Sequence, residues 1–242
     1  MIEIIPAIDI IDGRCVRLSQ GDYSRQKTYD YDPVTMVARY ADSGVTRVHV
    51  VDLDGAKVAM PQNLAVLEKM ARIDGICIEW GGGLKSEVAV RQIFDAGAMY
   101  AIVGSVAAKQ PSLFAGWLDC FGADRMVLGA DVRDGKVSVN GWLEDLDVSI
   151  DDLISQFAPH GLNQVICTDI SRDGMLQGPS FELYTRLQTD YPEIDFTVSG
   201  GISSMDDILR LDTLNLRKVI VGKAIYEGRI SLQDIQKYIV SH

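Results

Sequence analysis

The sequence predicts an α/β fold: a single domain, residues 1–242, forming a (β/α)8 TIM barrel from two similar half-barrels. Three observations predict it. Short apolar runs alternate with amphipathic segments, no linker-like stretch interrupts them, and glycine and aspartate motifs recur about half a chain length apart. A chain of 242 residues, 47% of them hydrophobic, is near the size of such a barrel, although two small domains would also fit this length.

Eight apolar, β-branched runs are the expected strands, because buried parallel strands have this composition. They are residues 2–8, 47–51, 76–80, 100–103, 126–130, 164–167, 196–198 and 218–221. Helix-like segments lie between them, among them 33–41, 63–71, 87–96, 150–157 and 204–211. Eight strand–helix units in one chain favour a closed barrel over an open doubly wound sheet.

An internal repeat supports two half-barrels. Gly82 recurs as Gly200, an offset of 118 residues (200 − 82), and Asp9 recurs as Asp131, an offset of 122 (131 − 9). Both offsets lie close to half the chain, and the matches follow the same order in each half.

Charge and composition exclude several classes of function. The chain has 23 Lys and Arg against 34 Asp and Glu, a net charge of −11 that argues against nucleic-acid or anionic-membrane partners. The N-terminal segment has no basic region, and no apolar run reaches the roughly 18 residues of a spanning helix, so we expect a soluble cytoplasmic protein. Isolated cysteines and few histidines argue against disulfides and a metal site. The cysteines are Cys15, Cys77, Cys120 and Cys167.

Glycine-rich strand-to-helix junctions are the candidate phosphate sites, because they present backbone N–H groups to an anion. They occur in neighbouring pairs in each half of the chain. A single junction is as well explained by a tight turn, but the paired arrangement favours two phosphate groups. The candidate residues are Gly82, Gly83, Lys85, Gly104 and Ser105 in the first half and Gly200, Gly201, Gly222 and Lys223 in the second.

Aspartates at strand ends are the candidate acid–base groups. Asp9 closes the first expected strand and Asp131 the fifth, and these strands lie opposite each other in an eight-stranded barrel. Asp173 is a third candidate acid, although an aspartate before glycine is also a common turn residue. Asp52 and Asp169 close the second and sixth strands, where capping of the next loop is as good an explanation as catalysis.

Two long loops are expected after the first and fifth strands, residues 12–32 and 132–147, and such loops often cover active sites. The first carries Arg17, which suits a phosphate or carboxamide, although a solvated basic loop is the plain alternative. The second carries Trp142, which either stacks on a planar ring or packs against the rim. His49 is expected to be a buried or rim histidine rather than a base.

These residues together resemble the phosphoribosylformimino-aminoimidazole carboxamide ribotide isomerase family of histidine biosynthesis. The resemblance spans essentially the whole chain, and the combination is specific although each glycine motif alone is weak. The matching segments are residues 5–9, 12–13, 16–18, 20–23, 51–56, 81–83, 103–105, 131–133, 141–142, 167–174, 199–201 and 220–224.

The resemblance implies an Amadori rearrangement of a bisphosphorylated ribotide, without a cofactor and without an obligate protein partner. By this resemblance Asp9 removes the C2 proton, and either Asp131 or Asp173 is the acid. Arg17, Gly21 and Trp142 are implied to hold the substrate. The chain departs from the family at two places, Lys85 where arginine is usual and Met175 where threonine is common.

Three other functions are compatible with parts of the sequence. The related cyclase, which works with a glutaminase subunit, usually has Cys-Leu where this chain has Ala7-Ile8, and lysine where it has Arg17. A bifunctional isomerase that also acts on phosphoribosylanthranilate would use the same chemistry. A non-catalytic barrel that senses a phosphorylated metabolite would keep the glycine motifs but would not need Asp9 and Asp131.

Overall fold

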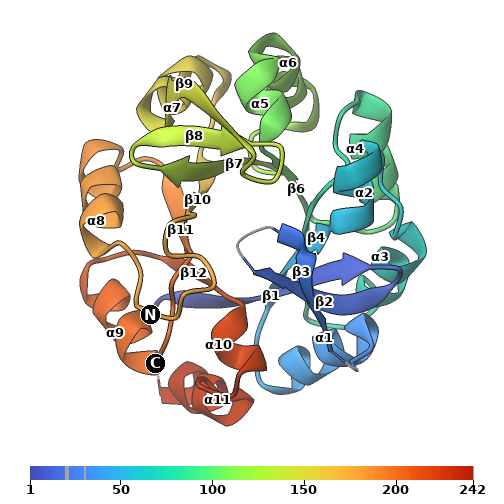
Figure 1. Ribbon diagram of the computed structural model, residues 1–242, viewed down its shortest axis with the longest axis vertical. Coiled ribbons are helices and arrows are strands. Elements are labelled where there is room, and N and C mark those ends of the chain that lie inside the picture. Colours follow the sequence, from blue (N-terminus) through green and yellow to red (C-terminus); the bar gives the residue numbers. More distant parts are fainter. Residues whose placement is uncertain (20–21, 30, 242) are drawn as a thin grey trace. The chain divides into compact units, whose positions relative to one another are not determined.

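The computed structural model describes residues 1–19, 22–29 and 31–241. Within them, eight parallel strands form a closed barrel with helices between the strands, in the hydrogen-bonded order β1, β4, β5, β6, β7, β10, β11 and β12, with β12 beside β1. Four further strands, β2, β3, β8 and β9, extend this sheet as two antiparallel additions (Figure 1). The eight expected strands are all present. The predicted α/β barrel is therefore confirmed.

By their internal contacts the residues form two compact units. Unit 1 contains Glu3–Ala101 and the residues from Ile220 on, and unit 2 contains Ile102–Val219. These boundaries differ from those of the two sequence halves, which divide the chain near its midpoint. That the chain is one domain stays a prediction.

Unit 1 carries three complete barrel strands, one hairpin and six helices of the described chain. Its elements are β1 (Glu3–Ile11), β2 (Arg14–Ser19), β3 (Asp22–Thr28), α1 (Pro33–Asp42), β4 (Arg47–Asp52), α2 (Leu53–Val58), α3 (Leu64–Met70), β5 (Cys77–Gly81), α4 (Glu87–Asp95), α10 (Lys223–Tyr226) and α11 (Leu232–Ser241). Two short strands cross the unit boundaries, β6 (Tyr100–Val103) and β12 (Lys218–Val221).

Unit 2 has the same kinds of element. They are α5 (Ser105–Lys109), α6 (Pro111–Phe121), β7 (Met126–Arg133), β8 (Lys136–Val139), β9 (Glu144–Ser149), α7 (Ile150–Phe157), the 3-10 helix η1 (Ala158–His160), β10 (Gln164–Asp169), α8 (Phe181–Asp190), β11 (Asp195–Ser199) and α9 (Met205–Thr213). The five expected helical segments correspond to α1, α3, α4, α7 and α9.

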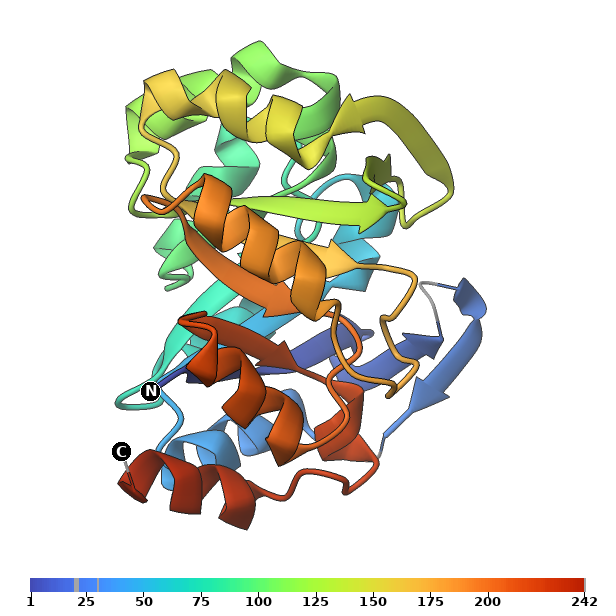
Figure 2. The ribbon, with the colours of Figure 1, turned by 90° about the vertical axis from the view of Figure 1, so that its left-hand side faces the viewer.

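Long segments do follow the first and fifth barrel strands as expected, and each consists largely of two antiparallel strands. After β1, Asp12 and Gly13 turn with φ of 49° and 71°, and β2 pairs antiparallel with β1. After β7, Asp134 and Gly135 turn with φ of 50° and 80°, and β8 pairs antiparallel with β7. Two residues with positive φ are the tight-hairpin turn that Asp-Gly favours. Figure 2 shows β2 and β3 side by side as one arm of unit 1 (blue).

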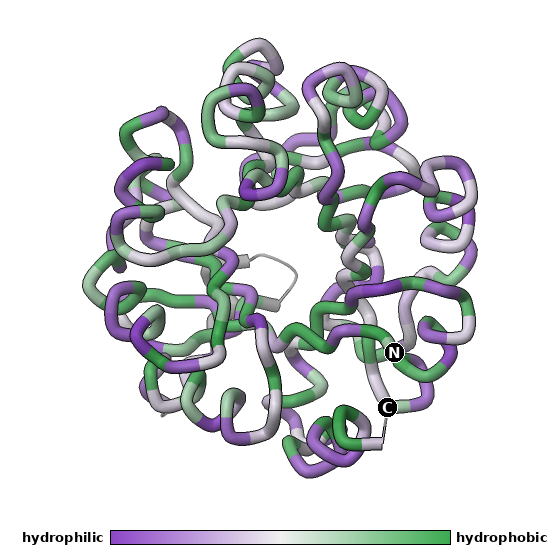
Figure 3. The backbone as a smooth tube through the Cα atoms, turned by 180° about the vertical axis from the view of Figure 1, so that it is seen from behind, coloured by the Kyte–Doolittle hydropathy of each residue, from purple (hydrophilic) through white to green (hydrophobic). Residues whose placement is uncertain are grey.

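Each unit buries its own apolar side chains. In unit 1, Trp80 of β5 and Tyr40 of α1 are fully buried. In unit 2, Phe114 of α6 packs edge-on against Phe157 of α7, with ring centroids 4.8 Å apart. Hydrophilic and hydrophobic residues alternate along the helices (Figure 3), which is the pattern of helices with one buried face. A large buried side chain contributes about 1.5–3 kcal/mol to stability.

Of the described residues, none belongs to a helix long and apolar enough to cross a membrane.

Candidate active site

Asp9 lies near the end of β1 in unit 1, where the side chain of Arg17 contacts it. Nη1 of Arg17 donates a hydrogen bond of 3.1 Å to Oδ2 of Asp9, and the two side chains are only 15% and 16% exposed. The β1–β2 pairing brings the two residues close along the chain of the hairpin: Asp9 is opposite Val16, and Arg17 follows Val16. Unit 1 thus holds a largely buried carboxylate directly beside a guanidinium group.

Gly222, directly before α10, lies against the same guanidinium. A Cβ atom at Gly222 would stand 2.6 Å from Nη2 of Arg17, so no larger residue fits there unless Arg17 moves. Lys223 follows as the first residue of α10. The predicted residues Asp9, Arg17 and Gly222 are therefore brought together in unit 1.

Asp131 of β7 in unit 2 is also contacted by the hairpin that follows its strand. Nε1 of Trp142 donates a hydrogen bond of 2.8 Å to Oδ2 of Asp131. Trp142 has a φ of 70° and lies in the turn between β8 and β9. The indole thus binds the carboxylate, which is neither of the two roles that the sequence suggested for it.

Asp52 holds a loop. It is fully buried, and its carboxylate accepts hydrogen bonds of 2.7–3.1 Å from the N–H groups of Gly55, Gln62 and Asn63 and from Nδ2 of Asn63. A carboxylate with four donors and no exposure is a structural anchor. Of the two explanations open for Asp52, the structure supports capping.

Asp169 has the same role in unit 2. Its Oδ1 accepts from the backbone N–H of Ser171 at 3.0 Å and from the Ser171 hydroxyl at 2.6 Å. Nε of Arg172 lies 3.8 Å from Oδ2. Asp169 therefore fixes the turn that leads to Asp173, which is half-buried and whose backbone N–H donates to the carbonyl of Asp169 at 3.0 Å.

Two of the predicted glycines are required by close backbone packing. Gly82 has a φ of 97°, and a Cβ atom there would overlap the backbone carbonyl of Asp52. Gly200 has the same φ, and a Cβ atom there would lie 2.7 Å from the backbone oxygen of Asp169. Both glycines thus pack on the strand-end aspartate of the neighbouring strand, which also supports the tight-turn explanation of these motifs.

The other predicted binding residues lie at the expected junctions. Gly83 and Lys85 follow β5, Gly104 and Ser105 follow β6, and Gly201 follows β11. Gly21 lies outside the described residues. Phosphate binding by these residues stays a prediction.

His49 lies within β4 and contacts Glu79, in agreement with the expected buried or rim histidine. Its Nδ1 is 2.7 Å from Oε1 of Glu79, which is 1% exposed. Nη1 of Arg47 is 3.5 Å from the other carboxylate oxygen, and Nη2 of Arg47 donates to the Tyr100 hydroxyl at 2.9 Å. A histidine that is largely covered and paired with a buried carboxylate in this way is structural.

The two buried thiol groups are poor nucleophiles. Burial raises the pKa of Cys15 to about 12 and also raises the pKa of Cys167. No group of three or more His, Cys, Asp or Glu side chains within the described part of the chain could hold a metal ion.

Two charged residues that hold the hairpins were missed from the sequence. Glu227 follows α10 and binds Lys27 of β3, and Lys109 ends α5 and binds Glu144 of β9. The partners are 200 residues apart in the first ion pair and 35 residues apart in the second, and no sequence pattern indicates that these exposed charges are in contact.

The fold and these residues define a class: (β/α)8-barrel proteins with a carboxylate at the end of a barrel strand, bound by a side chain from the hairpin that follows it. Comparison with known proteins narrows this class. A family model described as "Histidine biosynthesis protein" matches residues 3–231, and the chain belongs to this family.

The curated relatives share one name, 1-(5-phosphoribosyl)-5-((5-phosphoribosylamino)methylideneamino) imidazole-4-carboxamide isomerase. The protein of Cytophaga hutchinsonii is 46% identical over 238 residues, which cover 98% of this chain and 99% of the relative. That of Phocaeicola vulgatus is 45% identical over 239 residues, 99% of this chain and 100% of the relative. That of Flavobacterium johnsoniae is 43% identical over 237 residues, 98% and 99% of the two chains.

Proposed function

We propose that this chain catalyses the isomerisation for which its relatives are named, an Amadori rearrangement in histidine biosynthesis. The substrate is an aminoaldose ribotide and the product the corresponding aminoketose. The observation that carries the proposal is the pair of strand-end aspartates, Asp9 and Asp131, in a chain that matches these isomerases over nearly its whole length.

The reaction needs one acid and one base, and it needs neither an oxidant nor a metal. Protonation of the ring oxygen by Asp131 opens the sugar to a Schiff base. The carboxylate of Asp9 then removes the C2 proton, and reprotonation at C1 gives the aminoketose. Each such group contributes about 100-fold to 10,000-fold to the rate. Asp173 is the alternative acid, and the turnover rates of Asp131→Asn and Asp173→Asn decide between them.

Arg17 and Trp142 hold the substrate in this proposal. Both donate hydrogen bonds to the aspartates in the structure described above. When substrate binds, these donors turn to it, and the carboxylates become available for proton transfer. Gly21 is proposed to contact the substrate as well.

The two phosphate groups explain the duplicated glycine motifs. The compound in the relatives' name has two phosphoribosyl groups. Backbone N–H groups at strand-to-helix junctions bind phosphate without adding net charge, which suits a chain of charge −11. The residues proposed for phosphate binding are Gly82, Gly83, Lys85, Gly104, Ser105, Gly200, Gly201, Gly222 and Lys223.

The remaining proposals concern the setting. We place the enzyme in the cytoplasm, as one domain that acts on a small molecule without a cofactor, a nucleic acid or an obligate protein partner. The isolated cysteines and the acidic charge support this setting.

The test is conversion of the aminoaldose ribotide by the purified chain without added metal or cofactor, with binding of the same compound measured in parallel. The proposal predicts conversion. Tight binding without conversion would instead favour a metabolite sensor, and absence of both would contradict the assignment. Phosphoribosylanthranilate as a second substrate separates a dedicated isomerase from a bifunctional one.

A further inference from the structure

Two short helices, α5 and α10, share an arrangement that the proposed chemistry does not use. Each begins directly after a strand-end glycine, Gly104 or Gly222, and each leads into a charged residue that binds a hairpin. After α10, Oε1 of Glu227 accepts from Nζ of Lys27 at 2.8 Å and from the Tyr29 hydroxyl at 3.1 Å.

The second ion pair has the opposite polarity. Nζ of Lys109, the last residue of α5, donates to Oε2 of Glu144 at 2.6 Å. The lysine is therefore on the helix in unit 2, whereas it is on the strand in unit 1. Asn140, two residues before Trp142, donates to the same Glu144 oxygen at 2.7 Å.

The helix residues of the two pairs occupy equivalent places in the sequence repeat, whereas their partners lie near opposite ends of equivalent strands. Lys109 and Glu227 are 118 residues apart (227 − 109), the offset that also relates Gly104 to Gly222 (222 − 104). Their partner strands β3 and β9 begin at residues 22 and 144, which are 122 apart (144 − 22), the offset that relates the two aspartates. Each unit thus joins the same helix to the same hairpin strand, with the charges exchanged.

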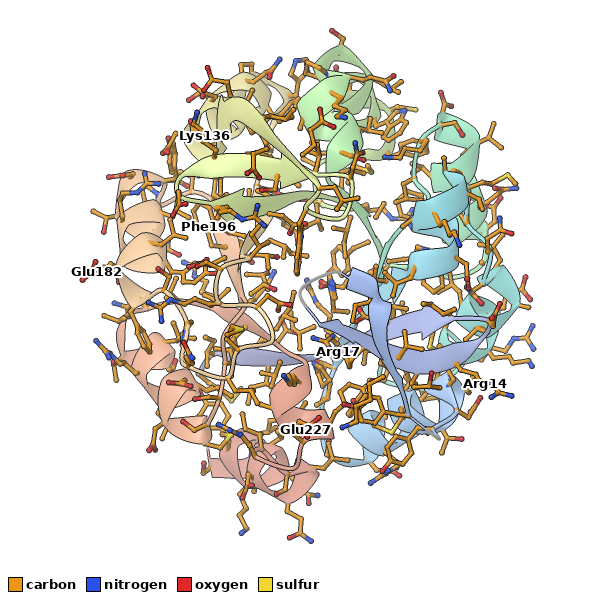
Figure 4. All side chains as sticks on the ribbon, in the orientation of Figure 1. Arg14, Arg17, Lys136, Glu182, Phe196 and Glu227 are labelled. Atoms are coloured by element: carbon orange, nitrogen blue, oxygen red, sulfur yellow. The ribbon has the colours of Figure 1, made fainter. Side chains whose placement is uncertain are left out.

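Each hairpin also carries the side chain that binds an aspartate. In unit 1, Arg17 of β2 donates to Asp9 and lies against Gly222. Figure 4 labels Arg17 and Glu227 on neighbouring parts of this unit. The ring of Tyr29 packs at a tilt against that of Tyr226 in α10, with centroids 4.6 Å apart, so the hairpin meets the helix through several side chains.

We propose that Glu227 and Lys109 are positioning residues, each of which holds a hairpin so that Arg17 or Trp142 is placed correctly for the reaction. This inference rests on the proposed function, because it takes Arg17 and Trp142 as the groups that exchange aspartate for substrate. Neither Glu227 nor Lys109 needs to touch the substrate.

Their contribution to stability is small on general grounds. The side chains of Lys27 and Glu227 are 59% and 34% exposed, and an ion pair between solvent-exposed side chains contributes little to stability. The hydrogen bonds from Lys27 and then Tyr29 lower the pKa of Glu227, which agrees with a Glu227 carboxylate that is ionised at neutral pH and binds Lys27. A kinetic effect larger than this stability effect would therefore arise from geometry, since a small misplacement of a catalytic group can cost about 100-fold in rate.

Charge reversal tests the inference, because the two units already use both polarities. In unit 2 the variants are Lys109→Glu, Glu144→Lys and the double exchange, and in unit 1 they are Lys27→Glu, Glu227→Lys and their double exchange. We expect each single reversal to lower kcat/KM between about fivefold and 100-fold. Each double exchange should return kcat/KM to within about threefold of the wild type, because it restores an ion pair between the same two positions.

The matched control is the Glu87–Arg91 pair of α4, which has the same 2.6 Å length as the unit 2 pair and exposed side chains. Glu87→Arg and Arg91→Glu should leave kcat/KM unchanged. Thermal midpoints of all single reversals should resemble those of the control, which separates positioning from general destabilisation.

The inference is overturned if the single reversals match the α4 control in kcat/KM, or if the double exchanges stay as slow as the single variants. Asp9→Asn distinguishes this failure from failure of the proposed function. If Asp9→Asn is inactive while the charge reversals leave kcat/KM unchanged, only the positioning role of the ion pairs is contradicted. If Asp9→Asn is active, the proposed base is contradicted, whatever the reversals show.

Discussion

At the scale of single residues, each unit pairs a carboxylate with one donor from a neighbouring hairpin. Arg17 supplies a charged donor to Asp9, and Trp142 supplies a neutral one to Asp131. The hairpin of each unit therefore positions a donor, a guanidinium in one unit and an indole N–H in the other, on the carboxylate at the end of the preceding strand.

Trp142→Phe tests the donor to Asp131, because phenylalanine keeps an aromatic ring but has no N–H group. We expect kcat/KM to fall by about twofold to tenfold, because the variant lacks the N–H group that is proposed to turn to the substrate, and a typical hydrogen bond is worth about 0.5–1.5 kcal/mol. The measurement is steady-state kinetics together with a melting curve.

Trp117→Phe is the matched control for that variant. Trp117 is 2% exposed in α6, and within the described residues its Nε1 has no hydrogen-bond partner. It should lose stability through the smaller ring and keep its activity. A Trp142→Phe enzyme with wild-type kcat/KM would show that the indole N–H does not serve the reaction.

At the scale of elements, the glycine turns depend on the neighbouring strand as well as on their own backbone. Gly82→Ala places a methyl group onto the backbone of Asp52, at a φ that favours glycine. We expect unfolding in urea to show a loss of more than about 2 kcal/mol, because both overlap and positive φ oppose the change.

Gly75→Ala provides the comparison, because Gly75 also has a positive φ, 76°, but no atom lies within 4 Å of an added Cβ. Its expected cost is only about 1 kcal/mol. Equal losses for the two variants would contradict the account of Gly82 as a position defined by contact with the next strand.

The hairpins show where sequence patterns stop being sufficient. Asp12-Gly13 and Asp134-Gly135 are recognisable turn signals, but β3 is polar throughout and β9 alternates over only two apolar residues, Leu146 and Val148, too few to identify a strand. The Arg17–Asp9 and Trp142–Asp131 contacts follow from strand pairing and turn geometry. They therefore could not be derived from residue type alone.

At the scale of the whole molecule, the barrel was predictable because its strands are apolar and are separated by regular helices. The repeat identified both aspartates and the glycine motifs, since each lies at a strand end in both halves. The ion pairs of Lys109 and Glu227 with the hairpin strands were not predictable. Pairing of exposed charges depends on where the elements are placed in space, and the residues of the unit 1 ion pair are 200 positions apart.

The most direct test of the central claim compares the wild type with Asp9→Asn in turnover of the aminoaldose ribotide and in binding of the same compound. The account predicts that the variant loses at least about 100-fold in kcat, because the base that removes the C2 proton is gone. It also predicts a Kd near that of the wild type, since the proposed phosphate contacts remain. A variant that turns over the substrate at the wild-type rate would contradict the role of Asp9 and with it the proposed mechanism.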